Sequence, residues 1–205
     1  MKYLLVILLF FSTSFQKNNE VTIDKKEAQD AFALLTDIRN NPDKYYEELK
    51  FEKGLKVSKI KLKWNDTLAK IAENKAFDMA NRNYMGHVDP DGYGMNYYIK
   101  KSGYKLQPKW TVEKNANYFE SLAANTYSGI ESIKVLVTDK NTPSFGHRNH
   151  LLGLDSWNSS LTDIGIGYSR RESGSTYQTY TCVIIAKHDL VRITKTSSQL
   201  SKRSC

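Results

Sequence analysis

The chain has 205 residues, of which 40% are hydrophobic and 12% aromatic, and it carries a formal net charge of +8. This composition excludes an intrinsically disordered chain, and the length suffices for one domain with its own hydrophobic core. The positive charge is concentrated in residues 50–63 and 187–205, where aromatic side chains do not alternate regularly with the basic ones as a stacking surface for nucleic acid requires. We therefore interpret these segments as a solvated loop and a basic C-terminal tail (189–205), and we expect no nucleic-acid partner.

Residues 1–16 have the pattern of a secretory signal peptide. Lys2 precedes an unbroken apolar run over 3–11, and small and polar residues begin at Ser12. The run is too short to span a bilayer, which takes about 20 residues, and no other segment is long and apolar enough. We therefore expect a cleaved signal, no transmembrane segment, and a secreted protein that is extracellular or periplasmic.

Helices are predicted for the segment that follows a polar lead-in over 17–27. Apolar residues recur at helical spacing from residue 25 to 39, with Asp24 as the N-cap and a stop at residues 40–42. The clearest helical pattern covers 65–83, where Asn65 is the N-cap and alanines allow close packing on a partner surface. Shorter helices are predicted over 42–49 and up to Lys101, separated by the lysine-rich loop 50–63 and the long helix.

Strands are predicted in the second half of the chain, over 117–124, 163–168 and 176–186. The last two are joined by residues 171–175, with Gly174 as the turn residue, so they should form a hairpin. A helix is predicted over 129–138. Helices followed by a few strands, with one helix inserted among them, favour an α+β layered domain.

The two cysteines leave two interpretations open. Cys182 lies in the last predicted strand, and Cys205 is at the end of the basic tail. An exported protein can form a disulfide between them, which would join the tail to the sheet. The alternative is two free thiols.

Three of the four histidines lie in two short segments that each contain a Gly-His pair, 85–92 and 146–153. Imidazole is the commonest protein metal ligand and titrates near neutral pH. The two segments are therefore candidates for one shared site, which would include His87 and His147. The alternative is that each histidine caps a helix or fills a gap in the core.

Three neighbouring side chains receive other interpretations. We expect His150 to cap or pack, although it lies three residues from His147 and would share its face if this segment were helical. Arg148 should pair with a carboxylate or a carbonyl and order the turn. His188 should be exposed at a strand end.

Several segments resemble, in order and spacing, the landmarks of one protein family; they are residues 35–42, 62–69, His87, 118–123, 146–152 and 163–167. The family is the CAP superfamily of cysteine-rich secretory proteins, antigen 5 and pathogenesis-related 1 proteins, also called SCP domains. The chain looks most like a bacterial secreted member. The resemblance covers residues 28–188, nearly the whole chain after the signal peptide.

This resemblance implies a three-layer α-β-α sandwich around a small antiparallel sheet, with a central cleft lined by two histidines and two acidic residues. Carried over, the histidines are His87 and His147, and the acids are Glu120 and, as the candidate for the second, Asp139. These four residues would bind Zn²⁺ or another divalent cation. Glu120 could be a general base, an orienting partner of an imidazole, or a ligand.

Three functions remain open at this stage. The first is a secreted, monomeric binding protein whose cleft holds a metal and an extracellular peptide, glycan or lipid. The second is a metal-dependent hydrolase, a peptidase or esterase, with Glu120 as the catalytic candidate. The third is a secreted metallonuclease that uses the basic segment around His147. A polar network without catalytic or binding function is the structural alternative to all three.

Overall fold

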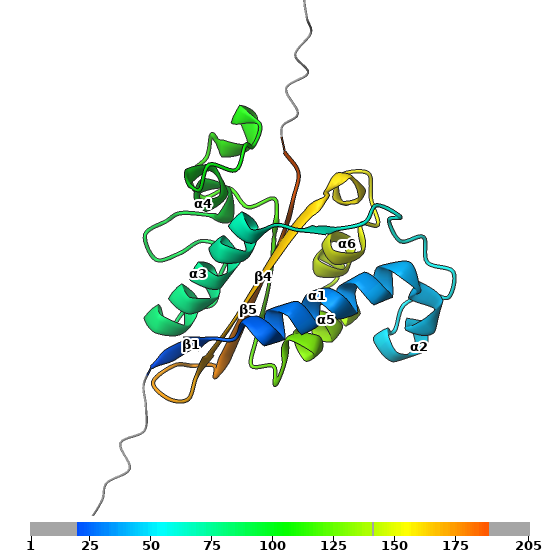
Figure 1. Cartoon of the computed structure of the whole chain (residues 1–205), viewed down its shortest axis with the longest axis horizontal. Helices are drawn as coiled ribbons and strands as arrows, with labels where there is room; N and C mark the ends of the chain where they lie inside the picture. The colour runs from blue at the N-terminus through cyan, green and yellow to red at the C-terminus, as the bar shows by residue number, and fades with distance from the viewer. Residues whose placement is uncertain (1–19, 141, 189–205) are drawn as a thin grey trace, which may run out of the picture.

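The computed structural model describes residues 20–140 and 142–188, which form three layers (Figure 1). A sheet lies between helix α3 (Asp66–Arg82) on one side and helices α1 (Lys25–Asn40) and α5 (Gly129–Thr138) on the other. This arrangement confirms the α+β class and the three-layer α-β-α sandwich expected from the sequence.

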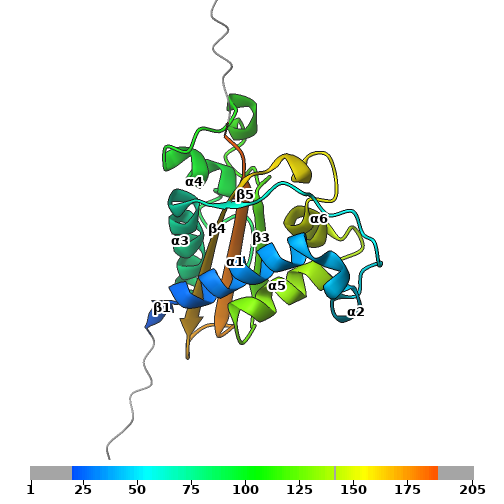
Figure 2. The same ribbon diagram turned by 45° about the vertical axis from the view of Figure 1, so that its right-hand side comes forward.

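The sheet consists of β1 (Val21–Ile23), β2 (Lys63–Trp64), β3 (Glu120–Ala124), β4 (Asp163–Arg171) and β5 (Thr179–Ala186). The strands lie in the order β1-β4-β5-β3 and pair antiparallel, whereas β2 pairs parallel with the start of β4. Figure 2 shows β4, β5 and β3 side by side, with β3 nearest to α6 (Gly146–Leu152). The strand β3 is therefore at one edge of the sheet.

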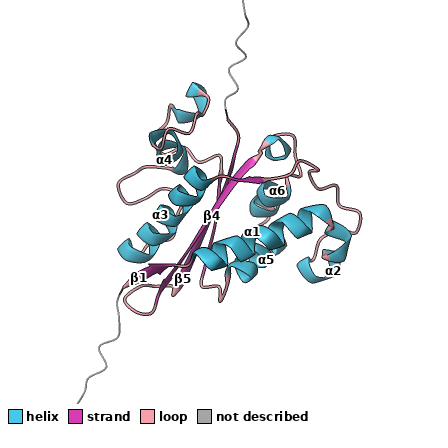
Figure 3. Cartoon of the chain, viewed as in Figure 1, coloured by secondary structure: helices cyan, strands magenta, loops and turns pink. Residues whose placement is uncertain are grey.

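Short helices and turns complete the fold around these layers (Figure 3). They are α2 (Tyr46–Leu49), α4 (Met95–Lys101) and 3-10 turns at Pro42–Lys44, Pro108–Thr111 and Asn158–Ser160. None of the helices in the described part of the chain is both long and apolar enough to cross a membrane.

The helix α3 packs on β4 at unusually short range because two residues of the strand have no side chain. A Cβ atom placed on Gly165 would lie 2.1 Å from the backbone nitrogen of Ala69, and one on Gly167 would lie 2.2 Å from the carbonyl carbon of Ala72. Glycine within a strand is typical of such close backbone approach. The alanines on the helix face complete the contact, so the alanine-rich stripe predicted from the sequence is part of the core.

The predicted helix starts are confirmed by their caps. The side chain of Asp24 accepts a hydrogen bond from the Glu27 N–H at 3.2 Å, and that of Asn65 accepts one from the Leu68 N–H at 3.0 Å. The helix predicted over 129–138 has the same bounds in the structure. These elements are specified by local sequence, which is why their ends could be placed closely.

Several predicted boundaries were wrong. Residues 21–23, expected in the polar lead-in, form β1 and pair with the end of β4; their apolar-polar-apolar alternation covers only three residues, too few to predict a strand. The lysine-rich loop contributes its last residue to β2. The strands predicted from residues 117 and 176 begin at Glu120 and Thr179, because residues 118–119 and 172–178 form bends that interrupt the extended backbone.

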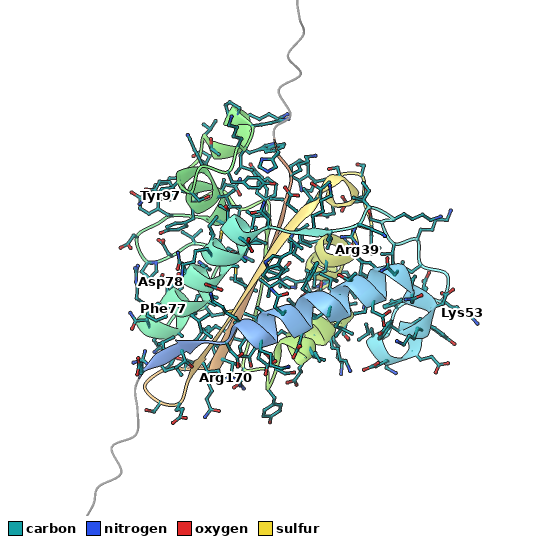
Figure 4. The ribbon with its side chains drawn as sticks, in the orientation of Figure 1. Arg39, Lys53, Phe77, Asp78, Tyr97 and Arg170 are labelled. Atoms are coloured by element: carbon teal, nitrogen blue, oxygen red, sulfur yellow. The ribbon has the colours of Figure 1, made fainter. Side chains whose placement is uncertain are left out.

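The first turn of α1 is attached to the sheet by ion pairs. Arg170, on β4, lies 3.4 Å from the carboxylate of Asp24 and 2.7 Å from that of Glu27 (Figure 4). Glu27 also accepts a hydrogen bond from the Gly129 N–H at 2.8 Å, which connects α1 to the start of α5. A Cβ on Gly129 would lie 2.0 Å from the Glu27 carbonyl oxygen, so this crossing also depends on glycine.

Three expectations concern residues outside the described part of the chain. They are the signal peptide at 1–16, the basic tail at 189–205 and the disulfide partner Cys205. Within the described residues, Cys182 is buried and has no disulfide partner. The choice between a disulfide and two free thiols therefore stays a prediction.

We expect Gly167→Ala to destabilise the protein by about 1–3 kcal/mol or more, because its Cβ would overlap the backbone of α3. Urea denaturation followed by circular dichroism measures the change in the free energy of unfolding. The matched control is Gly86→Ala, since the nearest atom to its Cβ would be 3.5 Å away. Equal free energies of unfolding for the two variants would show that the close approach of α3 to β4 does not require glycine at position 167.

Candidate functional site

The first of two carboxylate–imidazole pairs joins His87 to Glu120. Glu120 is the first residue of β3, and His87 lies in the segment between α3 and α4. Its Nδ1 atom is 2.8 Å from Glu120 Oε2. The other carboxylate oxygen, Oε1, accepts a hydrogen bond from the buried Cys182 thiol at 3.5 Å. Burial, followed by the nearby Glu120 charge, raises the pKa of Cys182 well above its usual value, so this thiol stays protonated.

The second pair joins His147, in the first turn of α6, to Asp139. The Nδ1 atom of His147 is 2.8 Å from Asp139 Oδ1, and its backbone N–H donates to Oδ2 at 2.9 Å. The Arg148 N–H donates to the same oxygen at 3.3 Å. Asp139 caps the end of α5 in a left-handed conformation, with φ of 48°. One carboxylate therefore orients the ring and also binds the start of α6.

The protonation state of Asp139 follows from two opposing effects. Burial raises the pKa of this carboxyl, but hydrogen bonds from His147, Thr142 and the Arg148 backbone, with the charge of His147, outweigh it and lower the pKa below the usual value. The carboxylate is thus ionised near neutral pH and accepts hydrogen bonds only. The Nδ1 atom of His147 must be the donor in this pair.

Arg148 orders the segment as predicted. Its Nε donates to the Val137 carbonyl at 2.7 Å and its Nη2 to the Thr138 carbonyl at 2.5 Å. These are carbonyls of the last turn of α5, which the helix itself leaves without partners. Arg148 thus holds α6 against the end of α5.

The two imidazoles line one cleft of about 470 Å³. The side chains of Glu120 and Asp139 are 0% and 3% exposed, whereas those of His87 and His147 are 45% and 29% exposed. The carboxylates are therefore buried behind the rings. Since each Nδ1 faces a carboxylate, each Nε2 is left without a protein hydrogen bond in the described residues.

A wall of aromatic and amide side chains also borders the cleft, formed by Asn117, Tyr118, Trp157 and Asn158. Sequence analysis did not select these residues, nor Cys182 as the neighbour of Glu120. A signal for Cys182 existed, since pairing the two strands places it opposite Leu122, two residues from Glu120. Trp157 borders the cleft because of the path of the long connection before β4, and no pattern in the sequence near this residue predicts that position.

His150 packs in the core, as expected. Its Nδ1 is 2.7 Å from the hydroxyl oxygen of Ser121, on β3. Burial is the main cause that lowers the pKa of His150 to about 4. The nearby charges of His147, Arg39 and His87 lower this pKa further, whereas a hydrogen bond to the Ile185 backbone raises it. The ring is therefore neutral under ordinary conditions.

Arg39 is a second unusual group beside this core. It lies at the end of α1 near α6 (Figure 4), and its guanidinium nitrogens have no hydrogen-bond partner among the described residues. Burial lowers its pKa to about 10. A Cβ on Gly153, which caps the C-terminus of α6, would lie 3.1 Å from this guanidinium, so the positive charge is next to the negative end of the helix dipole.

His188 is not part of the cleft. It is exposed, as predicted, with its ring stacked on Tyr104 at 3.9 Å between centroids and its Nε2 3.4 Å from Asp163. The structure therefore brings together His87, His147, Glu120 and Asp139 and leaves His188 elsewhere.

Within the described residues, no group of three or more His, Cys, Asp or Glu side chains is arranged to hold a metal ion. A metal in the cleft would accordingly be held by the two imidazoles, with its other positions open. Another hollow of similar volume, about 510 Å³, lies between α3 and α4 but includes none of the four residues. Size alone therefore does not identify the site.

Comparison with known proteins gives consistent results. The family model described as CAP, the cysteine-rich secretory protein family, matches residues 32–184. No curated protein matches the chain.

Two solved structures resemble the fold. One is an extracellular protein containing an SCP domain from Bacillus anthracis str. Ames, with 21% identity and a TM-score of 0.50 over 80% of this chain. The match covers 41% of that protein, so this chain spans less than half its length. The other is an outer surface protein from Borrelia burgdorferi, with 15% identity and a TM-score of 0.52 over 83% of this chain and 99% of that one.

We expect the stability of the protein to fall as the pH is lowered from about 6.5 to about 4. The folded state keeps His150 neutral, while the unfolded chain binds a proton over this range, so the contribution is fully present above the unfolded pKa. The free energy of unfolding should fall by on the order of 3 kcal/mol over this range. Urea unfolding over this pH range measures it in the natural protein and in His150→Asn.

The variant should lose this part of the pH dependence, whereas the matched control His188→Asn, an exposed position, should keep it. An unchanged pH dependence in His150→Asn would show that the ring is not kept neutral by folding.

Proposed function

This chain belongs to the cysteine-rich secretory protein (CAP) family, and from that premise we propose that it is a secreted protein whose cleft binds a divalent metal, such as Zn²⁺, together with an extracellular ligand. His87 and His147 would hold the metal through their Nε2 atoms. Glu120 and Asp139 would orient the two rings and would not be ligands themselves. The metal would supply a Lewis-acidic position at which a ligand oxygen or water binds.

The observation that carries the proposal is that each Nδ1 lies within hydrogen-bond distance of a buried carboxylate oxygen, 2.8 Å in both pairs. A metal-binding histidine typically donates its other N–H to a carboxylate, which fixes the tautomer and raises the basicity of the free nitrogen. Both rings of the cleft meet this condition. The residues present therefore fit an open metal site with two imidazole ligands.

The geometry supports binding more than hydrolysis by Glu120. Both oxygens of this carboxylate are engaged, one by His87 and one by Cys182, and its side chain is fully buried. A general base must reach the proton that it removes, within hydrogen-bond distance or through one water. The hydrolase remains the second candidate; turnover of a peptide or ester that is lost in Glu120→Gln, with the fold retained, would favour it.

The ligand class is supported by the wall of the cleft. Tyr118 and Trp157 border the cleft with aromatic side chains, and Asn117 and Asn158 border it with amide side chains. Such a wall suits a peptide, a glycan or the polar end of a lipid. The two structural relatives are an extracellular protein and an outer surface protein, which supports secretion of this chain.

We expect His87→Ala and His147→Ala each to abolish saturable Zn²⁺ binding, because each removes one of the two imidazole ligands. Isothermal titration calorimetry slightly above neutral pH on the protein without its signal peptide measures the binding. The matched control is His188→Ala, which removes an exposed histidine outside the cleft and should bind as the natural protein does. Binding that survives in both cleft variants would refute the assignment.

Asp139→Asn should weaken Zn²⁺ binding by about 10- to 100-fold, because the amide no longer fixes the His147 ring as a carboxylate does. The same titration measures this, with thermal unfolding to confirm the fold. Affinity equal to that of the natural protein would show that Asp139 serves the structure alone.

A further inference from the structure

The strand β3 has one row of backbone groups without hydrogen-bond partners among the described residues. Phe119 and Ile185 face each other, since the Ile185 N–H donates to the Phe119 carbonyl at 2.9 Å, and the Asn125 N–H donates to the Thr179 carbonyl at 2.9 Å. Antiparallel pairing alternates, so odd-numbered residues of this strand bond to β5.

The even-numbered residues Glu120, Leu122 and Ala124 therefore direct their N–H and C=O groups away from the sheet. None of these backbone groups has a hydrogen-bond partner within residues 20–140 and 142–188. They recur every two residues, or about 6.8 Å.

Two hollows lie along this same edge. The first is the cleft described above, which includes Glu120 and Ser121; the second, of about 590 Å³, includes residues 122–124. Thr142 and His147 border both hollows, which makes them neighbouring parts of one groove.

The groove lies at the strand's edge and not on one face of the sheet. Successive side chains of a strand point to opposite faces. Glu120 points to the face where His87 meets it, and Ser121 points to the other face, where it contacts His150, yet both border the first hollow. Leu122 and Ala123 likewise both border the second hollow.

We propose that this groove binds an extended peptide, which adds to the sheet as a strand beside β3 and passes His147. The inference rests on the proposed function in one respect, since it names the ligand class of the same cleft. A peptide backbone in extended form presents N–H and C=O groups with the required two-residue period, which lipids and glycans lack. Main-chain hydrogen bonds would hold the peptide, and the two hollows would take its side chains.

The lining of the second hollow specifies the side chains of the peptide. On the side of α3 it is apolar, with Leu122, Ala124 and Met85. Its charged side chains are Lys134 and Lys140 together with Asp139, whose carboxylate is buried and paired with His147. Lys134 pairs with Glu48, whereas Lys140 has no carboxylate partner among the described residues. Charge complementarity therefore favours a peptide that alternates apolar and acidic residues.

The test uses a blocked, fluorescently labelled hexapeptide of alternating leucine and glutamate, titrated with the full protein without its signal peptide, in the presence of EDTA. N-methylation of one set of residues, either the leucines or the glutamates, should weaken binding on the order of ten-fold per site, since it removes a hydrogen bond to β3. Methylation of the other set should not weaken binding. Sensitive leucines would indicate an antiparallel peptide, and sensitive glutamates a parallel one.

The proposal would be overturned if N-methylation of leucines and of glutamates weakened binding equally, if neither weakened it, or if the hexapeptide did not bind. The EDTA keeps the test separate from metal binding: failure here with intact Zn²⁺ titration would reject the peptide and leave the metal site, and the reverse result would do the opposite.

A protein variant provides the second readout. Lys140→Glu should weaken binding of the leucine–glutamate peptide and strengthen binding of a leucine–lysine peptide, whereas the control Lys105→Glu, exposed and outside the groove, should change neither. Equal effects of the two variants would overturn the side-chain assignment. Analytical ultracentrifugation tests whether a second copy of the chain occupies the edge of β3. The variant Ala124→Pro removes an outward N–H of this edge. A dimer of the natural protein that dissociates in this variant would assign the edge to a second copy and overturn the peptide proposal.

Discussion

The close contact between α3 and β4 fixes the geometry on which the rest of the structure depends. With hydrogen atoms as the only side chains at Gly165 and Gly167, helix backbone meets strand backbone directly, and Gly129 allows the same where α5 crosses α1. Both faces of the sheet are thereby covered at short and well-defined distances. Because α3 is held in this way, the segment that follows it brings His87 to Glu120, and because α5 is held, its end brings Asp139 to His147.

Burial of the two carboxylates explains why folding itself orients the two imidazoles. A buried carboxylate is stable only when donors surround it. The imidazole N–H is one such donor in each pair, and Asp139 has two backbone N–H groups in addition. The same hydrogen bonds that stabilise the fold therefore orient the rings. A structural polar network and the proposed metal site are therefore compatible, because the proposed metal would use a ring orientation that folding has already established.

Sequence reasoning succeeded where the determining interactions are local. Asp24 and Asn65 marked helix starts because a cap bonds within its own turn. It failed for β1, whose three residues are a strand only because β4 lies beside them. Of the site, two Gly-His segments in a histidine-poor chain suggested that His87 and His147 belong together, and Glu120 and Asp139 came from family resemblance. Cys182 and Trp157 were missed as neighbours of the site. Cys182 reaches Glu120 through the pairing of β3 with β5, and Trp157 reaches the cleft through the connection before β4.

The edge of β3, which no described strand pairs with on its outer side, also has a consequence for solubility. Exposed strand edges are templates for edge-to-edge aggregation, and proteins limit this with short strands and nearby charge. Here the strand has five residues and is followed by Asn125 in a left-handed conformation, with φ of 58°, which stops it from extending. Lys134 and Lys140 border the same edge. An edge of this length is long enough to accept one more strand, and the lysines disfavour the stacking of identical chains by charge repulsion.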